Sequence, residues 1–455
     1  MPPTLIQTHA PLQESDLRAH FVSGIKDVSD LKVGVEWEKI GVYRDNGTAI
    51  RYSGSRGVER IFNALASDYG WQPLATPAGH VIALRKHETW ITLEPGGQIE
   101  LSGWKATTLD ENAGELFGHL REIKAVSEPL GIAWLGLGAQ PISVAHEIEW
   151  VPKERYAIMR DLLKERGALT YSMMKETASV QISVDYTSEE DAADKLRLAL
   201  ALSPFFTAMF ANSPLERGRP TGFQSRRAEI WRKTDPSRTG ILRSVFNPRF
   251  GFDDYVDYAL DVPLLFLRRS DRWIPVRNLT FREFMKSGYG DFVPELEDWD
   301  LHLTSVFTES RLKTYVEIRS LDCQKTELGL AAVAFIKGLF YDPAARKAAW
   351  EAVADLTFDQ RLSLASEAAQ KGLKTAFKGL FLIEHAAALL GHAEEGLKRL
   401  TNRKLALPDE TNYLNPLKYV ILERNMNPAE KLLSELGQRG GESVENILHC
   451  AAIWP

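Results

Sequence analysis

The sequence contains almost no cysteine and no long apolar run. Only two of its 455 residues are cysteines, Cys323 and Cys450, and they lie far apart in the chain. Neither a disulfide framework nor a cysteine-based zinc site can be built from them. No segment approaches the roughly 18–20 consecutive apolar residues of a membrane-spanning helix, so we expect no membrane partner.

The N-terminus lacks the features of a targeting segment. Residues 1–16 show neither a cationic start followed by an apolar block nor an amphipathic helix rich in Arg and Ser. This pattern argues against a signal or transit peptide and predicts a cytoplasmic protein.

A surplus of positive charge is also missing. The formal net charge is −6, whereas general nucleic-acid binders concentrate Lys and Arg to replace phosphate counterions. We therefore expect no nucleic-acid partner. A nucleotide such as ATP is not excluded, because its charge is neutralised locally.

The chain changes character about two thirds of the way along. Its length exceeds what a single simple core accommodates, and strand-like and helical segments alternate until about residue 320. After that the pattern is helical and rich in Ala, Leu and Lys. We predict an α+β fold with two associated parts, an α+β catalytic body at 1–323 and a helical C-terminal lobe at 324–455.

Hydrophobic periodicity predicts the individual elements. We expect strands at 31–43, 81–84 and 89–102, the last broken by a Pro-Gly-Gly turn, and helices at 109–127 and 189–210. Ser55 is expected to cap a helix that runs to Ala66. C-terminal helices are expected at 328–339, 344–354, 358–371, 375–390 and 428–436. The density of Pro and Gly between 212 and 240 predicts an ordered, functional loop.

Acidic residues occur at strand positions where acids are disfavoured. In residues 33–39 the side chains alternate between the two faces of the sheet. Val33, Val35 and Trp37 are therefore expected to face the core, while Glu36 and Glu38 share the opposite face.

Two further strand segments repeat this pattern. The Pro-Gly-Gly turn at 95–97 is expected to bring Glu94 close to Gln98 and Glu100 across a hairpin. In the segment 315–319, Glu317 and Arg319 point to one face.

Carboxylates gathered in one cavity would have raised pKa values unless cations neutralise them. Magnesium suits such a site, because it prefers carboxylate oxygens, water and substrate phosphate. The pattern therefore indicates phosphoryl-transfer chemistry. The alternative is a solvent-exposed sheet face with no chemical role.

A series of segments between about residues 31 and 319, with a weaker echo at 427–433, occurs in the order found in one enzyme family. These segments are Glu-Trp-Glu-Lys (36–39), Thr-Leu-Glu-Pro-Gly-Gly-Gln-Ile-Glu-Leu-Ser-Gly (92–103), Pro-Lys-Glu-Arg-Tyr-Ala-Ile-Met-Arg (152–160), Thr-Ala-Ser-Val-Gln (177–181), Ala-Asn-Ser-Pro (211–214), Ile-Trp-Arg-Lys-Thr-Asp-Pro-Ser-Arg-Thr-Gly (230–240), Phe-Gly-Phe-Asp-Asp-Tyr-Val-Asp-Tyr-Ala-Leu-Asp-Val-Pro (250–263) and Leu-Thr-Phe-Arg-Glu-Phe (279–284). Together they resemble the plant-type glutamate–cysteine ligases, also found in proteobacteria, within the carboxylate–amine ligase superfamily related to glutamine synthetase.

The resemblance implies a glutamine-synthetase-like fold, in which an antiparallel sheet flanked by helices forms a funnel-shaped active site for Mg²⁺ and ATP. It also implies a set of site residues. The metal ligands would be Glu36, Glu38, Glu94, Glu100 and Glu317, with Gln98 beside them. Arg238 and Arg319 would be catalytic, and Arg227, Trp231 and Gln98 would bind substrate. For each arginine a structural salt bridge is the alternative, and for Trp231 a role in core packing.

The chain also departs from the family pattern. The plant enzymes have a cysteine at the position of Ala178 and a cysteine pair around 279–284, so we expect no thiol-based regulation of that kind. Glu176 stands where the family often has Arg. After Arg319 the usual Gly-Ala-Asp-Gly-Gly is replaced by Ser-Leu-Asp-Cys-Gln at 320–324, which leaves the acceptor open.

The leading hypothesis is an ATP-dependent glutamate–cysteine ligase, which forms a γ-glutamyl phosphate and catalyses the first step of glutathione biosynthesis. Its partners would be glutamate, cysteine and ATP, and the protein would be a monomer or homodimer. One alternative keeps this chemistry with a different amine acceptor. The other is a non-catalytic homologue that binds nucleotide or glutamate.

Overall fold

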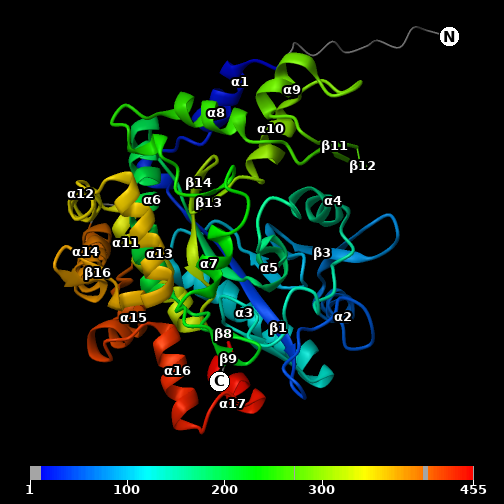
Figure 1. The fold of residues 1–455 in the computed structure, drawn as a ribbon, viewed down its shortest axis with the longest axis vertical. Coiled ribbons are helices and arrows are strands. Elements are labelled where there is room, and N and C mark those ends of the chain that lie inside the picture. Colours follow the sequence, from blue (N-terminus) through cyan, green and yellow to red (C-terminus); the bar gives the residue numbers. More distant parts are fainter. Residues whose placement is uncertain (1–11, 271, 403–407, 454–455) are drawn as a thin grey trace.

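The computed structural model describes residues 12–270, 272–402 and 408–453 (Figure 1). Most of the N-terminal segment in which we expected no targeting sequence lies outside these residues. Within them, no single helix is long and apolar enough to cross a membrane. Helices α11 (Thr326–Tyr341) and α12 (Pro343–Glu351) meet the criteria of length and composition only as a pair bent by 93°.

An antiparallel sheet of nine strands forms the centre of the protein. Its hydrogen-bonded order is β14-β15-β7-β1-β5-β4-β3-β2, and β6 pairs with the far end of β1. The strands are β1 (Val33–Tyr43), β2 (Gln72–Ala75), β3 (Val81–Lys86), β4 (Thr89–Leu93), β5 (Ile99–Ser102), β6 (Ile132–Leu135), β7 (Ser179–Val184), β14 (Ser310–Leu312) and β15 (Val316–Asp322). The predicted strands at 31–43, 81–84 and 89–102 are confirmed, and so is the turn that divides the last one.

The two faces of β1 differ as the alternation predicted. Val33, Val35 and Trp37 are buried in the main hydrophobic core. Helix α11 packs against this face so closely that a Cβ added to Gly329 would lie 2.7 Å from the ring of Trp37. The opposite face of β1 carries the glutamates, so the functional side of the sheet is the one turned away from α11.

Helices surround the sheet, and most of those after residue 324 gather with α6 on one side of it, while the last two lie at its lower end in Figure 1. The remaining helices are α1 (Glu14–Val22), α2 (Val58–Tyr69), α3 (Leu109–Ser127), α4 (Glu154–Leu163), α5 (Thr170–Glu176), α6 (Glu189–Phe210), α7 (Arg226–Arg232), α8 (Phe252–Asp261), α9 (Phe281–Ser287), α10 (Leu296–Leu303), α13 (Phe358–Lys371), α14 (Leu382–Asn402), α15 (Asn415–Lys418), α16 (Pro428–Gln438) and α17 (Val444–Ala451). The predicted α+β class, with an antiparallel sheet flanked by helices and a helical C-terminal part, is confirmed.

Side-chain caps explain why some helix boundaries follow directly from the sequence. Helix α3 begins at its predicted residue because the Thr108 hydroxyl accepts a hydrogen bond from the Glu111 amide, and Ser188 caps α6 in the same way. Helix α2 is present as predicted, but its predicted N-cap was wrong. The residue that precedes this helix is Gly57, not Ser55, because residues 54–57 form a turn in which the Gly57 amide donates to the Gly54 carbonyl.

Four two-stranded ribbons lie outside the main sheet. They pair β8 (Leu215–Glu216) with β9 (Arg219–Pro220), β10 (Thr239–Gly240) with β13 (Phe307–Thr308), β11 (Phe266–Arg269) with β12 (Arg272–Pro275), and β16 (Ala376–Phe377) with β17 (Leu380–Phe381). The last ribbon replaces the start of the helix expected at 375–390. Lys378 and Gly379 have φ values of 47° and 80°, which a right-handed helix does not contain.

The segment 212–240 is ordered, as predicted. It also contains α7, a short helix that the density of Pro and Gly concealed. The boundary between 1–323 and 324–455 coincides with the passage from β15 to α11. Because α13 packs on α6 and α11 packs on β7 across that boundary, the division into two parts stays a prediction.

The close packing of α14 on α11 generates a stability prediction. A Cβ added to Gly396 would lie 2.1 Å from the Gly338 carbonyl oxygen of α11, whereas one added to Gly391 on the same helix meets nothing within 4 Å. We expect Gly396→Ala to lower the free energy of unfolding by about 1–3 kcal/mol, because the backbone of α11 must move. Gly391→Ala is expected to raise it by up to ~1 kcal/mol, since alanine favours helix. Urea denaturation of both variants measures this difference, and equal effects would contradict the close approach of the two helices.

Candidate active site

Strand pairing brings three predicted glutamates together. Glu38 on β1 lies directly opposite Glu100 on β5. Glu94 ends the neighbouring strand, and its amide donates to the Gln98 carbonyl (2.9 Å), so the chain turns back at 95–97 as expected. Carboxylate oxygens of Glu38, Glu94 and Glu100 all lie within 4.8 Å of one another. We call these three residues the acidic triad.

Neighbouring donors hold the carboxylates of the triad in place. The Glu38 carboxylate accepts hydrogen bonds from the Ser179 amide (2.6 Å) and from the Gln181 side chain (2.9 Å). The Glu100 carboxylate accepts from the hydroxyls of Thr92 (3.0 Å) and Ser102 (2.6 Å). The carboxylates of Glu38 and Glu100 are therefore fixed on the sheet without losing all of their free acceptor capacity.

Burial and mutual repulsion make these carboxylates poor anions. Burial raises the pKa of Glu38 to about 8, and the charges of Glu94 and Glu100 act in the same direction. The pKa of Glu36 also rises to about 8 through burial and the charges of Glu100 and Glu317. Burial is the main cause of the raised pKa values of Glu94 and Glu100 as well. Such a group is stable in its ionised form only beside a cation.

Glu317 is the exception among the predicted metal ligands. Burial alone would raise its pKa, but Arg311, Lys313 and Arg319 outweigh burial and hold the pKa well below its usual range. Its carboxylate contacts Arg311 Nε (2.5 Å), Lys313 Nζ (3.2 Å) and Arg319 Nη1 (2.9 Å). Glu317 is thus neutralised by the protein itself and lies outside the acidic triad, as does Glu36.

Gln181 connects these two groups of charges, although sequence reasoning did not select it. The Gln181 side chain accepts a hydrogen bond from Arg319 and donates one to Glu38. Its position on β7 lies opposite Glu36 on β1. The signal for it was its place at the end of the Thr-Ala-Ser-Val-Gln segment, which carries the resemblance.

Gln98 has a different role from the one expected. Its side chain accepts from the Gly96 amide (3.0 Å) and donates to the Thr177 carbonyl (2.8 Å). Both ends of the amide are therefore used to clamp the turn. Gln98 positions Glu94 through the backbone of this turn and does not itself contribute to the triad.

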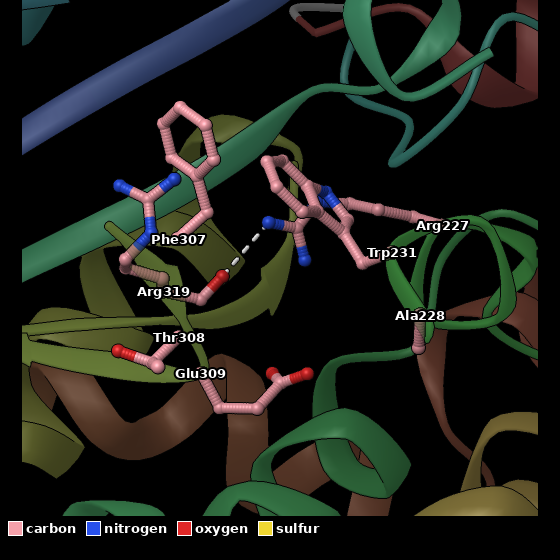
Figure 2. A pocket seen from close by; sticks show the side chains of 7 residues that line it. All are labelled: Arg227, Ala228, Trp231, Phe307, Thr308, Glu309 and Arg319. Carbon is pink, nitrogen blue, oxygen red and sulfur yellow. Dashed lines mark hydrogen bonds between the residues drawn. The ribbon is translucent and has the colours of Figure 1, made fainter. Parts of the chain in front are cut away.

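A hollow lies next to the triad, and it is lined by Arg227, Ala228, Trp231, Phe307, Thr308, Glu309 and Arg319. Figure 2 shows Arg319 and Phe307 on one side of it and Arg227 and Trp231 on the other. The Arg227 guanidinium donates to the Arg319 carbonyl (2.8 Å). The structure thus brings together three residues predicted from the sequence and adds Glu309, which the sequence did not indicate.

Asp322 holds Arg227 at the edge of this hollow. It is 1% exposed, and its carboxylate accepts from the Asn212 amide and from the hydroxyls of Ser213 and Ser225. Arg227 Nη1 lies 4.0 Å from the same carboxylate. The neighbouring Cys323 is buried, and its thiol donates to the Glu38 carbonyl (2.9 Å). The departure at 320–324 therefore lies behind the site and supports it.

Arg238 is not brought into the site. Its guanidinium is 1% exposed and donates to the Asp235 carboxylate (2.8 Å), to Ser305 and to the Pro263 carbonyl (2.8 Å). These contacts fasten the 230–240 segment to its neighbours. The structural salt bridge, given above as the alternative, is the role that the contacts support.

Two cations on the other side of the triad were missed. Lys153 and Arg155, at the start of α4, act electrostatically on Glu94. Burial, followed by repulsion from Arg155, lowers the pKa of Lys153 to about 8, while Glu94 and Glu100 oppose that change. Both residues fall within the 152–160 segment that carries the resemblance, which was the available signal.

The raised carboxylate pKa values predict a pH-dependent response to divalent cations. Because Glu36 and Glu38 titrate near pH 8 in the folded protein and near 4.5 otherwise, the folded state holds more protons between these values. The free energy of unfolding should therefore fall as pH rises through this window. A bound cation compensates the negative charge of the ionised carboxylates. Because more of these groups are ionised at pH 8 than at pH 6, the rise in Tm caused by MgCl₂ is expected to be larger at pH 8.

Two variants localise this effect. Glu38→Gln, which is neutral at every pH, should weaken both the pH slope and the magnesium response. Glu122→Gln removes a carboxylate whose partners are Lys86 and Trp71 rather than residues of the triad. This variant should preserve both the pH slope and the magnesium response. An equal magnesium response at pH 6 and pH 8 would contradict the assignment.

Comparisons with known proteins bear on the family of this chain. The model of the family described as glutamate-cysteine ligase family 2 matches residues 32–449. The chain is 37% identical over 452 residues to glutamate–cysteine ligase B, chloroplastic, of Oryza sativa subsp. japonica, covering 98% of this chain and 89% of the relative. It is 38% identical to glutamate–cysteine ligase, chloroplastic, of Arabidopsis thaliana, covering 98% and 84%.

A solved structure shares the fold. The crystal structure of glutamate–cysteine ligase from Francisella tularensis in complex with AMP matches with a TM-score of 0.56 at 13% identity, covering 94% of this chain and 88% of that one. The cytoplasmic location predicted from the N-terminus is contradicted, because the curated relatives are named as chloroplastic. The extent of the family match and the identity to these relatives establish that the chain belongs to glutamate-cysteine ligase family 2.

Proposed function

We propose that the protein joins the γ-carboxylate of glutamate to the amine of cysteine at the expense of ATP, the first step of glutathione biosynthesis. The observation that carries this proposal is the acidic triad, flanked by buried cations and adjoining a hollow lined by two arginines and two aromatic rings. Family membership and the names of the relatives support the same activity.

The chemistry explains why the acidic triad and the hollow must lie side by side. A carboxylate becomes an electrophile only when one of its oxygens is turned into a leaving group. The γ-carboxylate oxygen attacks the γ-phosphorus of ATP, ADP leaves, and γ-glutamyl phosphate forms. The unprotonated amine of cysteine then attacks the carbonyl carbon, and phosphate leaves with the electron pair of the C–O bond. The site must therefore hold phosphate and amino acid together.

Magnesium fits the donor set of the triad. Three convergent carboxylates with raised pKa values offer the hard oxygen ligands that this ion prefers. Bound there, it would neutralise the phosphate oxygens while charge develops on them. Glu38, Glu94 and Glu100 are the proposed ligands, and Glu36 is a further candidate. The oxygens of Glu317 are already occupied by cations, so we propose that it orients Arg311 and Arg319.

Cations near the triad support the proposal that a triphosphate binds there. Lys153 and Arg155 approach from the side of Glu94, while Arg311 and Lys313 act electrostatically on Glu36. Guanidinium groups bind phosphate oxygens in a bidentate manner, and lysine acts as a point charge. We propose that these four residues hold the phosphates of ATP against the carboxylates.

The hollow is the proposed amino-acid pocket. Arg319 donates to Glu317 and to Gln181, and Gln181 in turn donates to Glu38 of the triad. We propose that it orients the γ-carboxylate for attack. Arg227, held by Asp322 at the opposite side, binds the α-carboxylate, and Trp231 packs against the carbon chain.

A different amine acceptor is the second candidate, favoured only by the departure at 320–324. Phosphate release from ATP, with magnesium and glutamate, is measured with cysteine, with other amino acids and without an acceptor. We expect release to require cysteine. Release at the same rate without an acceptor would contradict the proposal, and turnover with another amine would support the second candidate.

The same assay tests the site. Glu94→Gln should lower kcat by about 10²–10³-fold, because removing one preorganised charge at a phosphoryl-transfer site costs that much. Glu122→Gln is the matched control and should retain activity. Unchanged turnover in Glu94→Gln would refute the assignment of the triad.

The two arginines selected from the sequence should behave differently. Arg227→Lys is expected to raise the KM for glutamate by about 10–100-fold, because lysine cannot replace a bidentate guanidinium. Arg238→Lys loses buried hydrogen bonds and should lower the free energy of unfolding by about 1–3 kcal/mol, with the KM for glutamate unchanged. Thermal unfolding and steady-state kinetics separate the two outcomes. A raised KM for glutamate in Arg238→Lys, with the free energy of unfolding unchanged, would support a role for Arg238 in the site.

A further inference from the structure

Glu309 occupies a rigid position in the wall of the hollow. It lies between β13 and β14, where its amide donates to the Gly240 carbonyl (2.9 Å) and its carbonyl accepts from the Arg319 amide (3.0 Å). The backbone is thus fixed on both sides. Figure 2 shows the carboxylate turned toward the space beneath Arg227. These backbone contacts hold the Cα of Glu309 in the wall of the hollow.

The Glu309 carboxylate has no partner of its own. Within the described residues it makes no hydrogen bond and no ion pair, whereas Glu317 and Glu229 are each paired with at least two cations. Burial raises the pKa of Glu309, and the guanidinium groups of Arg227 and Arg319 act in the opposite direction. Glu309 is half-buried, and a carboxylate partly withdrawn from water is costly when nothing compensates its charge. The hollow therefore presents an acceptor that lacks a cationic donor.

The charges around the hollow match the two ends of an amino-acid head group. An α-carboxylate and an α-ammonium sit on one carbon atom, so a site for both needs opposite charges a few ångströms apart. Arg227 supplies the positive charge and Glu309 the negative one, on the same hollow. Trp231 and Phe307, whose ring centroids are 5.7 Å apart, provide the apolar surface for the carbon chain. Arginines alone would accept any dicarboxylate.

We propose that Glu309 binds the α-ammonium group of the donor amino acid and so makes the site specific for an amino acid over a simple dicarboxylic acid. This inference rests on the proposed function of the hollow as the donor pocket. It adds a requirement that the arginines do not impose. Glutarate, which is glutamate without its amino group, should bind the same arginines but leave Glu309 unpaired.

The experiment combines one substitution with one change of substrate. Wild type and Glu309→Gln are assayed with glutamate and with glutarate, with ATP, magnesium and cysteine held constant. Glu309→Gln should lower kcat/KM for glutamate by about 10–100-fold, mainly through KM, as expected for a charged hydrogen bond. It should change kcat/KM for glutarate by less than about 3-fold, because no ammonium is present. Glu309→Asp should restore part of the preference for glutamate.

A matched control separates this role from a structural one. Glu229→Gln, on α7, removes a carboxylate that is already paired with Arg232 and Lys233 and does not line the hollow. It should leave the ratio between the two substrates unchanged. Thermal unfolding of Glu309→Gln identifies loss of folding, and Glu309→Asp retains the charge if the Gln variant is unstable.

Binding is also measured by calorimetry, so the result does not depend on ligation. Selective loss of glutamate affinity in Glu309→Gln, with glutarate affinity retained, would support the inference even if wild type fails to ligate, which would refute only the proposed function. An equal loss for both ligands would overturn the role of Glu309. An effect confined to the KM for cysteine would overturn it too, since Glu309 would then act on the acceptor.

Discussion

The mutual repulsion of buried carboxylates on one face of a sheet is the constraint on which the rest of the site depends. Glu38, Glu94 and Glu100 are drawn together by strand pairing, and burial makes their ionisation unfavourable. Such a cluster is a poor way to stabilise a fold, because buried like charges oppose folding unless cations compensate for them. The surrounding cations and the proposed magnesium site are best understood as the response to this repulsion.

The negative charges of Glu317 and of the acidic triad are compensated in different ways. Glu317 is neutralised internally by Arg311, Lys313 and Arg319, so it acts as a fixed anchor for those cations. Among the residues that the structure describes, the triad carboxylates form no ion pair with a cation, so they keep capacity for an added one. A site organised in this way has its positive groups positioned before the phosphates arrive, and little reorganisation is needed when the charge moves.

The support for the pocket comes from behind it. Asp322 binds three neighbouring donors and faces Arg227, while Cys323 donates to the carbonyl of Glu38. Both residues belong to the segment 320–324, in which Asp322 matches the Asp of the family pattern and Cys323 departs from it. Because the side chains of Asp322 and Cys323 are buried, the sequence change within 320–324 affects the packing behind the active face. Arg319 is the residue of β15 that lines the hollow.

Local sequence patterns determined several features of this protein. The alternation in β1 placed Glu36 and Glu38 opposite the core, because strand periodicity is a local property. The Pro-Gly-Gly turn fixed the return of the chain to Glu100, and capping residues fixed the start of α3. The resemblance correctly indicated the family, since ordered segments carry that information without a structure.

Only the tertiary structure decided which of these residues act together. It separated Glu317 from the triad, removed Arg238 from the pocket, gave Gln98 a structural role, and revealed Gln181 and Glu309. The position of Gln181 between Glu38 and Arg319 depends on the register of β15, β7 and β1, which joins residues more than a hundred positions apart. Glu309 is placed by the hydrogen bonds of its loop to Gly240 and Arg319. Local periodicity states which face a side chain occupies, but it carries no information about the partner strand that supplies its neighbouring charge.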